Sequence, residues 1–371
     1  MNRPFAPAPP LALTLTLGLC LWLAGCGGQQ PEAALARYLE RLARTLDQPS
    51  PAVAVPEVPR LPPRGELRLD LEGGNLGTLD FLALSGCEVQ ITIGKRNSSL
   101  GLLASPSQRL LLELEFLRLA PACIAHMRNE ERTELAELLQ GAVELKQQQL
   151  PALIFNATLA GPEYRKLWQP PQDLGDYPVQ TSSVPLTALA AINASARRWL
   201  AGDYRASNVD FEIQLSEVAQ ADGGALLKAL ALQAGWLEAG NGLLRARRQR
   251  GPLCSGPIRP AAATVLRNVI GKFFVGEVQP WSAALGRRQH ELLPLVAALE
   301  SGLESALPGA YRDWQQQRAA SLQAWTAAPR QHVGELQQVL APCEQQSPPT
   351  APAPRPARAL RAYRYRESTV Y

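Results

Sequence analysis

The chain has 371 residues, of which 46% are hydrophobic, 19% charged and 6% aromatic, and its formal net charge is +4. This composition excludes a disordered chain, a collagen and a multi-pass membrane protein, and the length allows one large domain or two ordinary ones. Without residues 1–25 and 347–371 the chain has 31 basic and 32 acidic residues, so the excess positive charge lies in the C-terminal tail. We therefore expect no nucleic-acid partner.

The N-terminus resembles the signal of a bacterial lipoprotein. Arg3 precedes the apolar run Leu11–Leu23, which is too short to span a bilayer comfortably and fits a signal peptide. The run ends in Leu23-Ala24-Gly25-Cys26, which resembles a lipobox and implies cleavage of residues 1–25 and lipidation of Cys26. An ordinary secreted protein with a chance cysteine is the alternative. Because Gly27 is not the aspartate typical of inner-membrane retention, we expect an outer-membrane anchor with the folded part in the periplasm.

Cysteine usage agrees with that oxidising compartment. Cys20 leaves with the signal, and four cysteines remain besides Cys26: Cys87, Cys123, Cys254 and Cys343. Four cysteines allow three connectivities, and we expect the local pairs Cys87–Cys123 and Cys254–Cys343, each joining neighbouring helical segments. The alternative is a metal site, since His126 follows Cys123 by three residues. However, His290 and His332 are isolated and no C-x-x-C or H-E-x-x-H spacing occurs, so we expect neither a metal ion nor another cofactor.

The hydrophobic pattern becomes helical directly after the predicted lipid site. Four leucines at helical spacing predict a first helix within residues 31–48: Leu35, Leu39, Leu42 and Leu46. Prolines crowd residues 49–63 and predict an extended linker or strap, so residues 26–65 comprise the anchor, the first helix and this linker. Residues 66–71 alternate polar and apolar side chains, which fits one short strand.

Helical periodicity then continues to about residue 346. Ser105, Pro106 and Gln108 form a helix-start signature, and Asn129 is a candidate cap for the next helix. Further helices are predicted at residues 186–200, 211–219, 226–244, 260–278, 292–307 and 311–327, with a last one beyond Pro329. Proline-rich breaks are expected at residues 162–185 and 251–260. The prediction is an all-α fold, an irregular domain of roughly ten helices over residues 66–346.

Residues 347–371 have a different composition. Five prolines are followed by five arginines interleaved with Tyr363 and Tyr365. Such a segment buries too little apolar area to fold alone, which predicts a disordered tail. This basic tail is the first candidate for contact with peptidoglycan or anionic lipid.

Two polar clusters are candidate binding sites. In the first, Arg96, Asn97, Ser98 and Ser99, with Arg109 nearby, would bind an anion or a glycan at a helix junction. The structural alternative is a helix C-terminus followed by a polar turn that Gly101 closes. The second cluster, arginines 245, 247, 248 and 250, would touch lipid phosphates or peptidoglycan carboxylates, or form a solvated helix end.

Other chemistry-bearing residues fit structural roles. Trp314 and Trp325 share a helix face and are expected in the core. Glu300 and Glu304 lie opposite a leucine stripe and are expected on a solvated face. The sequence contains neither the G-x-S-x-G nor the S-x-x-K spacing of serine nucleophiles, and it suggests no catalytic residue.

Several short motifs occur in an order that resembles one family. They are Asp80-Phe81-Leu82 with Cys87, Arg96-Asn97-Ser98-Ser99-Leu100-Gly101, Ser107-Gln108-Arg109-Leu110, Pro252-Leu253-Cys254, Asn268-Val269-Ile270, Gln279-Pro280 and Leu292-Leu293-Pro294. Over residues 32–344 the chain is similar to the gammaproteobacterial lipoproteins grouped as domain of unknown function 3080. The resemblance implies a cell-envelope lipoprotein and brings no established activity. The arginine-rich tail lies outside it.

These patterns together predict a non-catalytic binding or scaffold protein on the periplasmic side of the outer membrane, with another envelope protein as its partner. A periplasmic hydrolase or glycan-processing enzyme with an unrecognised active site is the alternative. A lipid or lipoprotein carrier is a third hypothesis, and it requires a continuous apolar cavity.

Overall fold

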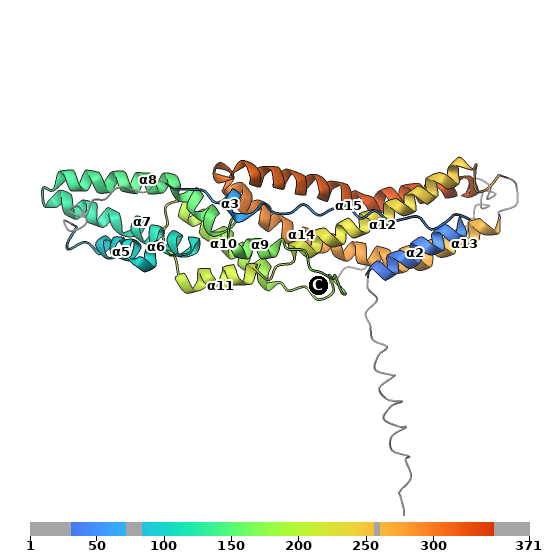
Figure 1. Cartoon of the computed structure of the whole chain (residues 1–371), viewed down its shortest axis with the longest axis horizontal. Helices are drawn as coiled ribbons and strands as arrows, with labels where there is room; N and C mark the ends of the chain where they lie inside the picture. The colour runs from blue at the N-terminus through green and yellow to red at the C-terminus, as the bar shows by residue number, and fades with distance from the viewer. Residues whose placement is uncertain (1–30, 72–83, 256–259, 345–371) are drawn as a thin grey trace, which may run out of the picture.

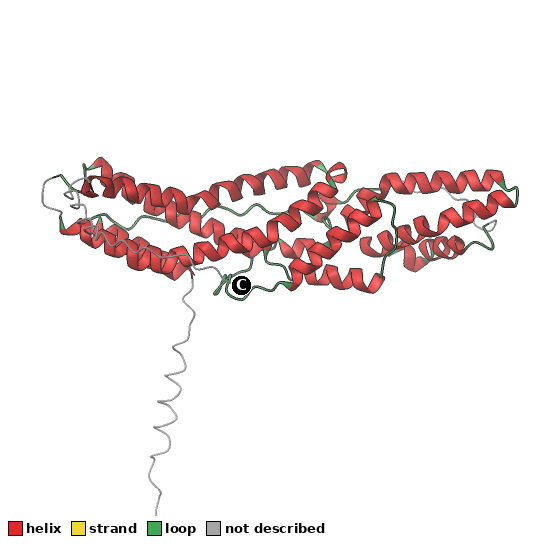
Figure 2. Ribbon diagram, turned by 180° about the vertical axis from the view of Figure 1, so that it is seen from behind, coloured by secondary structure: helices red, strands yellow, loops and turns green. Residues whose placement is uncertain are grey.

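The computed structural model describes residues 31–71, 84–255 and 260–344, which form a long bundle of helices (Figure 1). The predicted signal peptide, Cys26 and the predicted C-terminal tail lie outside the described residues. Within the described part there is no β-strand, as Figure 2 shows, so the predicted all-α fold is confirmed. None of its helices combines the length and the apolar character needed to cross a bilayer.

One end of the molecule is built on an antiparallel pair of long helices (Figure 1, left). Four helices lie here: α5 (Glu88–Asn97), α6 (Ser99–Leu102), α7 (Pro106–Asn129) and α8 (Thr133–Ala157). The helix start at Ser105 is confirmed, because its hydroxyl accepts a hydrogen bond from the Gln108 amide. Asn129, in contrast, does not cap the next helix. It is the last residue of α7, and Glu131 turns the chain with a φ of 58° before α8 begins.

The middle of the molecule contains shorter helices around one long one. They are α3 (Arg64–Leu67), α9 (Pro162–Leu167), α10 (Val184–Leu200), α11 (Asn208–Val218) and α14 (Gln279–Gly302), followed by a 3-10 turn at Glu304–Ala306. The helix predicted over residues 292–307 corresponds to α14, which begins at Gln279 and ends at Gly302, so both its ends lie earlier than the leucine stripe indicates. The predicted break at residues 162–185 contains the short helix α9.

The other end of the bundle joins the first helix of the chain to the last. It contains α2 (Pro31–Thr45), α12 (Gly223–Gln249), α13 (Ala261–Val269), a π-helix (Ile270–Val278) that continues into α14, and α15 (Gly309–Glu344). The apolar face of α2 packs against α12, α13 and the π-helix. The first helix is thus an integral part of the bundle.

Helix α15 is unbroken over 36 residues and passes through Pro329, so the predicted break at that proline is wrong. A proline inside a helix costs about 3 kcal/mol, because it removes a backbone hydrogen bond and crowds the preceding turn. On one face of α15, Trp325 and Ala328 before the proline and His332 and Leu336 after it are all buried. Burial of that face along α12 exceeds the cost of the proline.

The proline-rich residues 49–63 form an extended strap laid on the bundle. Val53, Val58 and Leu61 pack against the core. The Trp314 indole donates to the Pro59 carbonyl over 3.3 Å. The predicted strand at residues 66–71 is wrong: α3 occupies its start, and Leu69 pairs both its backbone groups with the Asn156 side chain.

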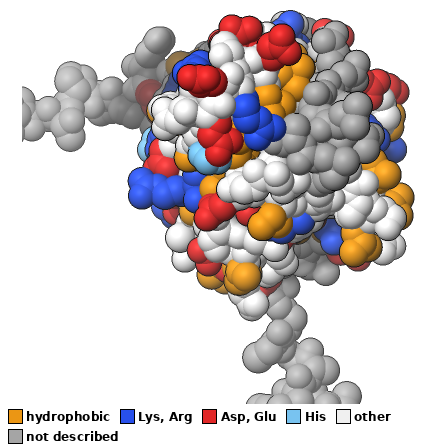
Figure 3. Space-filling model, turned by 90° about the vertical axis from the view of Figure 1, so that its left-hand side faces the viewer, with side chains coloured by type: hydrophobic (Ala, Val, Ile, Leu, Met, Phe, Trp, Pro, Cys, Tyr) orange, Lys and Arg blue, Asp and Glu red, His pale blue; other side chains and the backbone are white. Residues whose placement is uncertain are grey.

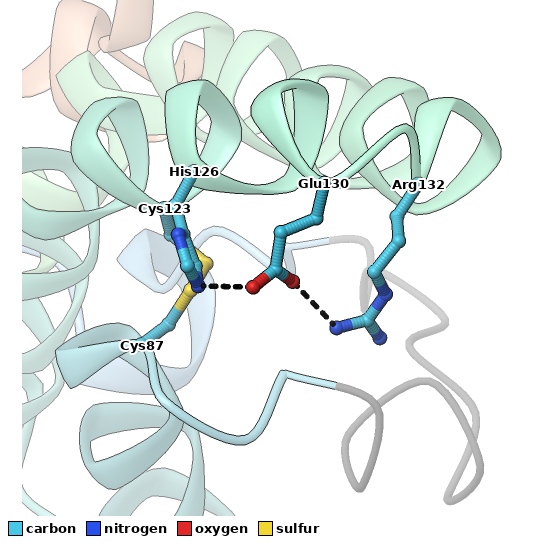
Figure 4. The surroundings of a disulfide bond; sticks show 5 residues. All are labelled: Cys87, Cys123, His126, Glu130 and Arg132. Carbon is cyan, nitrogen blue, oxygen red and sulfur yellow. Dashed lines mark ion pairs between the residues drawn. A yellow bond between two sulfur atoms is a disulfide. The ribbon is translucent and has the colours of Figure 1, made fainter.

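Both expected disulfides are present, one near each end of the bundle. Cys87, just before α5, is joined to Cys123 in α7, as Figure 4 shows, and Cys254 is joined to Cys343 in the last turn of α15. They close loops of 36 and 89 residues. By the loop-entropy account each contributes about 4 kcal/mol to stability.

Candidate functional site

A polar concave surface lies where residues 64–71, which follow the strap, cross helices α7 and α8. Three arginines line one cavity of about 390 Å³ there: Arg64 at the start of α3, Arg68 directly after α3, and Arg109 from α7. Asp70 is the one carboxylate among its described lining residues. We call this cavity the arginine cleft.

Local contacts fix the walls of the arginine cleft. The side chain of Asn156 on α8 donates to the Leu69 carbonyl over 2.8 Å and accepts from the Leu69 amide over 2.9 Å. This two-point pairing fixes the backbone at Leu69, between Arg68 and Asp70. On the opposite wall, the Arg109 guanidinium donates to the Leu102 carbonyl over 2.8 Å, which orients its remaining donors.

Arg64 and Arg68 are exposed, and within the described part of the chain neither forms an ion pair. Guanidinium groups bind carboxylates and phosphates through paired hydrogen bonds, and a cavity with three of them and one carboxylate has a positive potential. The arrangement therefore suits an anionic group of a ligand.

A second, smaller cavity of about 180 Å³ adjoins the arginine cleft and shares Arg109 with it. Its floor is the buried carboxylate of Glu113, which pairs with the Lys146 ammonium and, over 3.1 Å, with Arg96. Burial lowers the pKa of Lys146, while the Glu113 charge opposes that shift. Two cations thus share one buried carboxylate, which extends the positive surface inward.

The structure brings together three of the five predicted binding residues. Arg96, Asn97 and Arg109 line the smaller cavity. Ser98 has a structural role instead: its hydroxyl donates to the Lys95 carbonyl and accepts from the Gly101 amide, so it caps α6. Ser99 is exposed and is not among the described lining residues of either cavity.

Five charged residues of this region are not among the predicted binding residues: Arg64, Arg68, Asp70, Glu113 and Lys146. Arg68 and Asp70 lie inside residues 66–71, where the sequence pattern predicts a strand, and Arg64 precedes that segment. A signal was present for the other two, because Glu113 and Lys146 each interrupt the apolar face of a predicted helix. A charge in such a position has a buried partner far more often than not.

Glu300 is not on a solvated face, and this prediction is corrected. Its carboxylate is buried between α9 and α15, where it accepts hydrogen bonds from Tyr311 (2.7 Å), Gln315 (2.9 Å) and Arg318 (2.8 Å). The Arg318 guanidinium in turn lies over the rings of Trp168 and Trp314. The neighbour predicted with it, Glu304, is exposed as expected. Because this cluster is buried, its role is to stabilise the folded protein.

A second enclosed polar chain crosses the other end of the bundle. Asn241 donates its amide to Glu238 over 3.0 Å and so presents its oxygen to His332 Nδ1 at 2.7 Å. His332 Nδ1 therefore carries the proton, and Nε2 accepts from the Tyr38 hydroxyl. Burial lowers the pKa of His332 to about 4, which keeps the ring neutral.

The arginine cluster at the end of α12 is tied into the fold. Arg245 and Arg248 both pair with Glu335 of α15, and Arg250 donates to the carbonyls of Leu46 and Asp47. Arg247 caps its own helix end by donating to the Gly251 carbonyl. The solvated helix end considered from sequence is thus a junction between α2, α12 and α15.

Among the described residues, no three histidine, cysteine, aspartate or glutamate side chains are grouped so as to hold a metal ion. His126 lies beside the Cys87–Cys123 disulfide and pairs with Glu130 at 3.3 Å (Figure 4). Glu130 also faces Arg132, at 3.7 Å. At this end of the molecule acidic and basic side chains are interspersed (Figure 3).

The fold and the site define an elongated, disulfide-bonded helical protein with a basic cleft. The family described as "Protein of unknown function (DUF3080)" matches residues 35–347, and the chain belongs to this family. No curated protein and no solved structure matches the chain.

Proposed function

We propose that the protein is a lipid-anchored, non-catalytic binding or scaffold protein of the bacterial cell envelope. Cys26 would carry the lipid, and the helical part would stand on the periplasmic side of the outer membrane. The lipobox-like sequence before Cys26 supports the anchor. The two disulfides support an oxidising compartment.

The arginine cleft carries the binding proposal. Its three guanidinium groups face one cavity, and α6 and the turn after it expose large apolar side chains beside it: Leu100 of α6 is 83% and Leu103 of the turn is 86% exposed. The arginines of the cleft and the exposed leucines beside it together suit a protein segment that has acidic and apolar side chains. The proposed partner is therefore another envelope protein with an acidic docking segment.

Crosslinking and pulldown from intact envelopes test this proposal. The variant Arg64→Gln with Arg68→Gln should lose a specific partner that the wild type recovers, and recovery by the wild type should fall as salt rises. The control is Arg118→Gln with Arg128→Gln, which removes the same charge from exposed positions on α7. Equal recovery by both variants, or purified protein that hydrolyses peptidoglycan, would contradict the proposal.

The membrane anchor and the basic tail have their own tests. Mass spectrometry of the N-terminal peptide should show a lipid on Cys26, and Cys26→Ala should release the protein from membranes. Deletion of residues 347–371 should weaken binding to peptidoglycan or to anionic vesicles, because five of the six charged residues in that segment are arginines.

A further inference from the structure

An apolar pocket of about 510 Å³ opens beside the first described residue of the chain. Pro31 and Leu35 of α2 form one wall, Val179 of the loop between α9 and α10 forms another, and Trp281 and Ala284 of α14 form the third. The residues of this pocket share no member with those of the arginine cleft.

The loop wall of the pocket is held rigidly. Trp281 donates its indole N–H to the Tyr177 carbonyl over 2.9 Å, and the Tyr177 hydroxyl donates to Asp222 over 2.7 Å. Asp222 is fixed in turn by the buried guanidinium of Arg288, which also donates to the Ser182 carbonyl. The pocket is therefore preformed, a condition that lowers the cost of binding a flexible ligand.

Within this fixed wall Val179 is 78% exposed. Single exposed valines are common on protein surfaces. Val179, however, is held at the mouth of an apolar pocket, where its side chain adds apolar surface that a bound ligand can cover. Trp281, half-buried on the opposite wall, supplies a large apolar surface with its polar atom already bonded.

The short segment between Cys26 and Pro31 keeps any lipid on Cys26 near the pocket. Four residues lie between Cys26 and Pro31, and the five residue-to-residue steps span at most about 18 Å when the chain is fully extended. An acyl chain attached to Cys26 is therefore always close to the pocket, at an effective concentration in the millimolar range.

We infer that the pocket binds one acyl chain of the lipid attached to Cys26. This inference rests on the proposed function, since it requires lipidation of Cys26. When the protein is on a membrane, the bilayer and the pocket compete for the acyl chain. When the protein is away from a membrane, the pocket would keep the acyl chain out of water.

The charges near the pocket favour this occupant over other lipids. Its described lining contains two carboxylates, Asp176 and Glu277, and Glu277 is paired with Arg37 at 2.8 Å. A free fatty acid or an anionic phospholipid would bring a further negative charge to the mouth. The acyl chains of a lipidated cysteine end in neutral ester and amide groups and avoid this repulsion.

The test uses an unlipidated chain that begins at Gly27 and keeps every described residue. The probe is a synthetic peptide with the sequence of residues 26–30, bearing one palmitoyl chain on its N-terminal amine and a fluorophore. Val179→Asp places a charge at the mouth, and Ala284→Trp fills the pocket, so each should weaken binding about tenfold or more. Val209→Asp is the matched control, because Val209 is an exposed valine on α11, outside the pocket. Circular dichroism checks that each variant is folded.

Binding by the wild type and the control, with loss in both pocket variants, supports the inference. No binding to the folded wild type, or equal binding by all four proteins, overturns it. Tighter binding of free palmitate than of the neutral probe would also overturn it, in favour of an anionic lipid. An unmodified Cys26 in protein from membranes would instead contradict the proposed function, whatever the pocket binds.

Discussion

The Tyr38 hydroxyl and the His332 ring share a hydrogen bond of 2.6 Å between residues 294 positions apart. Tyr38 lies on α2 and His332 on α15, and the Phe274 ring packs against both. The bond therefore joins the first and last described helices inside the core, where neither group meets solvent. A buried polar pair of this kind fixes one arrangement of the two helices, because any other arrangement would leave its donors and acceptors unpaired.

Stability should fall as the pH drops below neutrality, because His332 stays neutral when folded. The folded pKa of about 4 lies below the ordinary value of 6.5, so only the unfolded chain takes up a proton between these values. The contribution is complete above pH 6.5, shrinks towards pH 4 by about 3 kcal/mol and then levels off. Urea unfolding from pH 7.5 to 4 measures it. His332→Gln should flatten the slope between pH 7 and 5, whereas His290→Gln, at an exposed position, should leave it unchanged.

Breaking the Glu300–Arg318 pair should be strongly destabilising. Glu300→Gln or Arg318→Met leaves one buried group without its ionic partner, which costs about 3 to 5 kcal/mol. The double variant should recover part of that loss, because no uncompensated charge remains. Chemical denaturation followed by tryptophan fluorescence gives all three values, and Trp168 and Trp314 report the site directly. Glu304→Gln is the control and should change stability by less than about 0.5 kcal/mol. Additive losses in the double variant would refute a specific coupling.

Gly235 should tolerate no side chain, because the strap lies directly on it. A Cβ atom at this position would stand 2.6 Å from the Ala54 carbonyl oxygen. Gly235→Ala should therefore displace the strap and destabilise the protein by about 1 to 3 kcal/mol. Gly242→Ala on the same helix meets nothing within 4 Å and should stabilise it by up to about 1 kcal/mol through helix propensity. Thermal unfolding of the two variants compares them. Equal shifts would mean that the strap does not lie on α12 in solution.

Loss of either disulfide should lower the free energy of unfolding by about 4 kcal/mol, slightly more for the longer loop that ends at Cys343. The variants are Cys87→Ser with Cys123→Ser, and Cys254→Ser with Cys343→Ser. Reduced wild type serves as the reference and should match a chain that carries all four substitutions. A reduced protein as stable as the oxidised one would contradict this prediction, because the bridges would then contribute nothing to the free energy of unfolding.

Local sequence signals predicted the local structure well. The Ser105 cap, the leucine stripe of α2, the core positions of Trp314 and Trp325 and the pairing of the four cysteines all agree with the structure. Each of these predictions depends on neighbouring residues, on helical spacing or on a choice among only three disulfide connectivities. Such information is present in a single sequence.

What the sequence could not provide are relations between distant segments. Glu300 has the spacing of a solvated residue, and only the approach of Arg318 from α15 explains its burial. Pro329 signals a helix end, and only packing along α12 keeps α15 continuous. The arginine cleft depends on where the segment after α3 crosses α8, which the Asn156–Leu69 pairing decides. In each of these three places, tertiary contacts worth a few kcal/mol outweigh the local preference of the sequence.

The packing of α2 against elements near the C-terminus has a consequence for the newly made chain. At a synthesis rate of 5 to 20 residues per second, the 294 positions between Tyr38 and His332 take roughly 15 to 60 s to appear. For the first part of that interval the leucines of α2 have no partner, because α12, the first helix that covers them, begins only at Gly223. The nascent protein therefore depends on a chaperone, or on the delay of folding, until α12, α13 and the π-helix have been made.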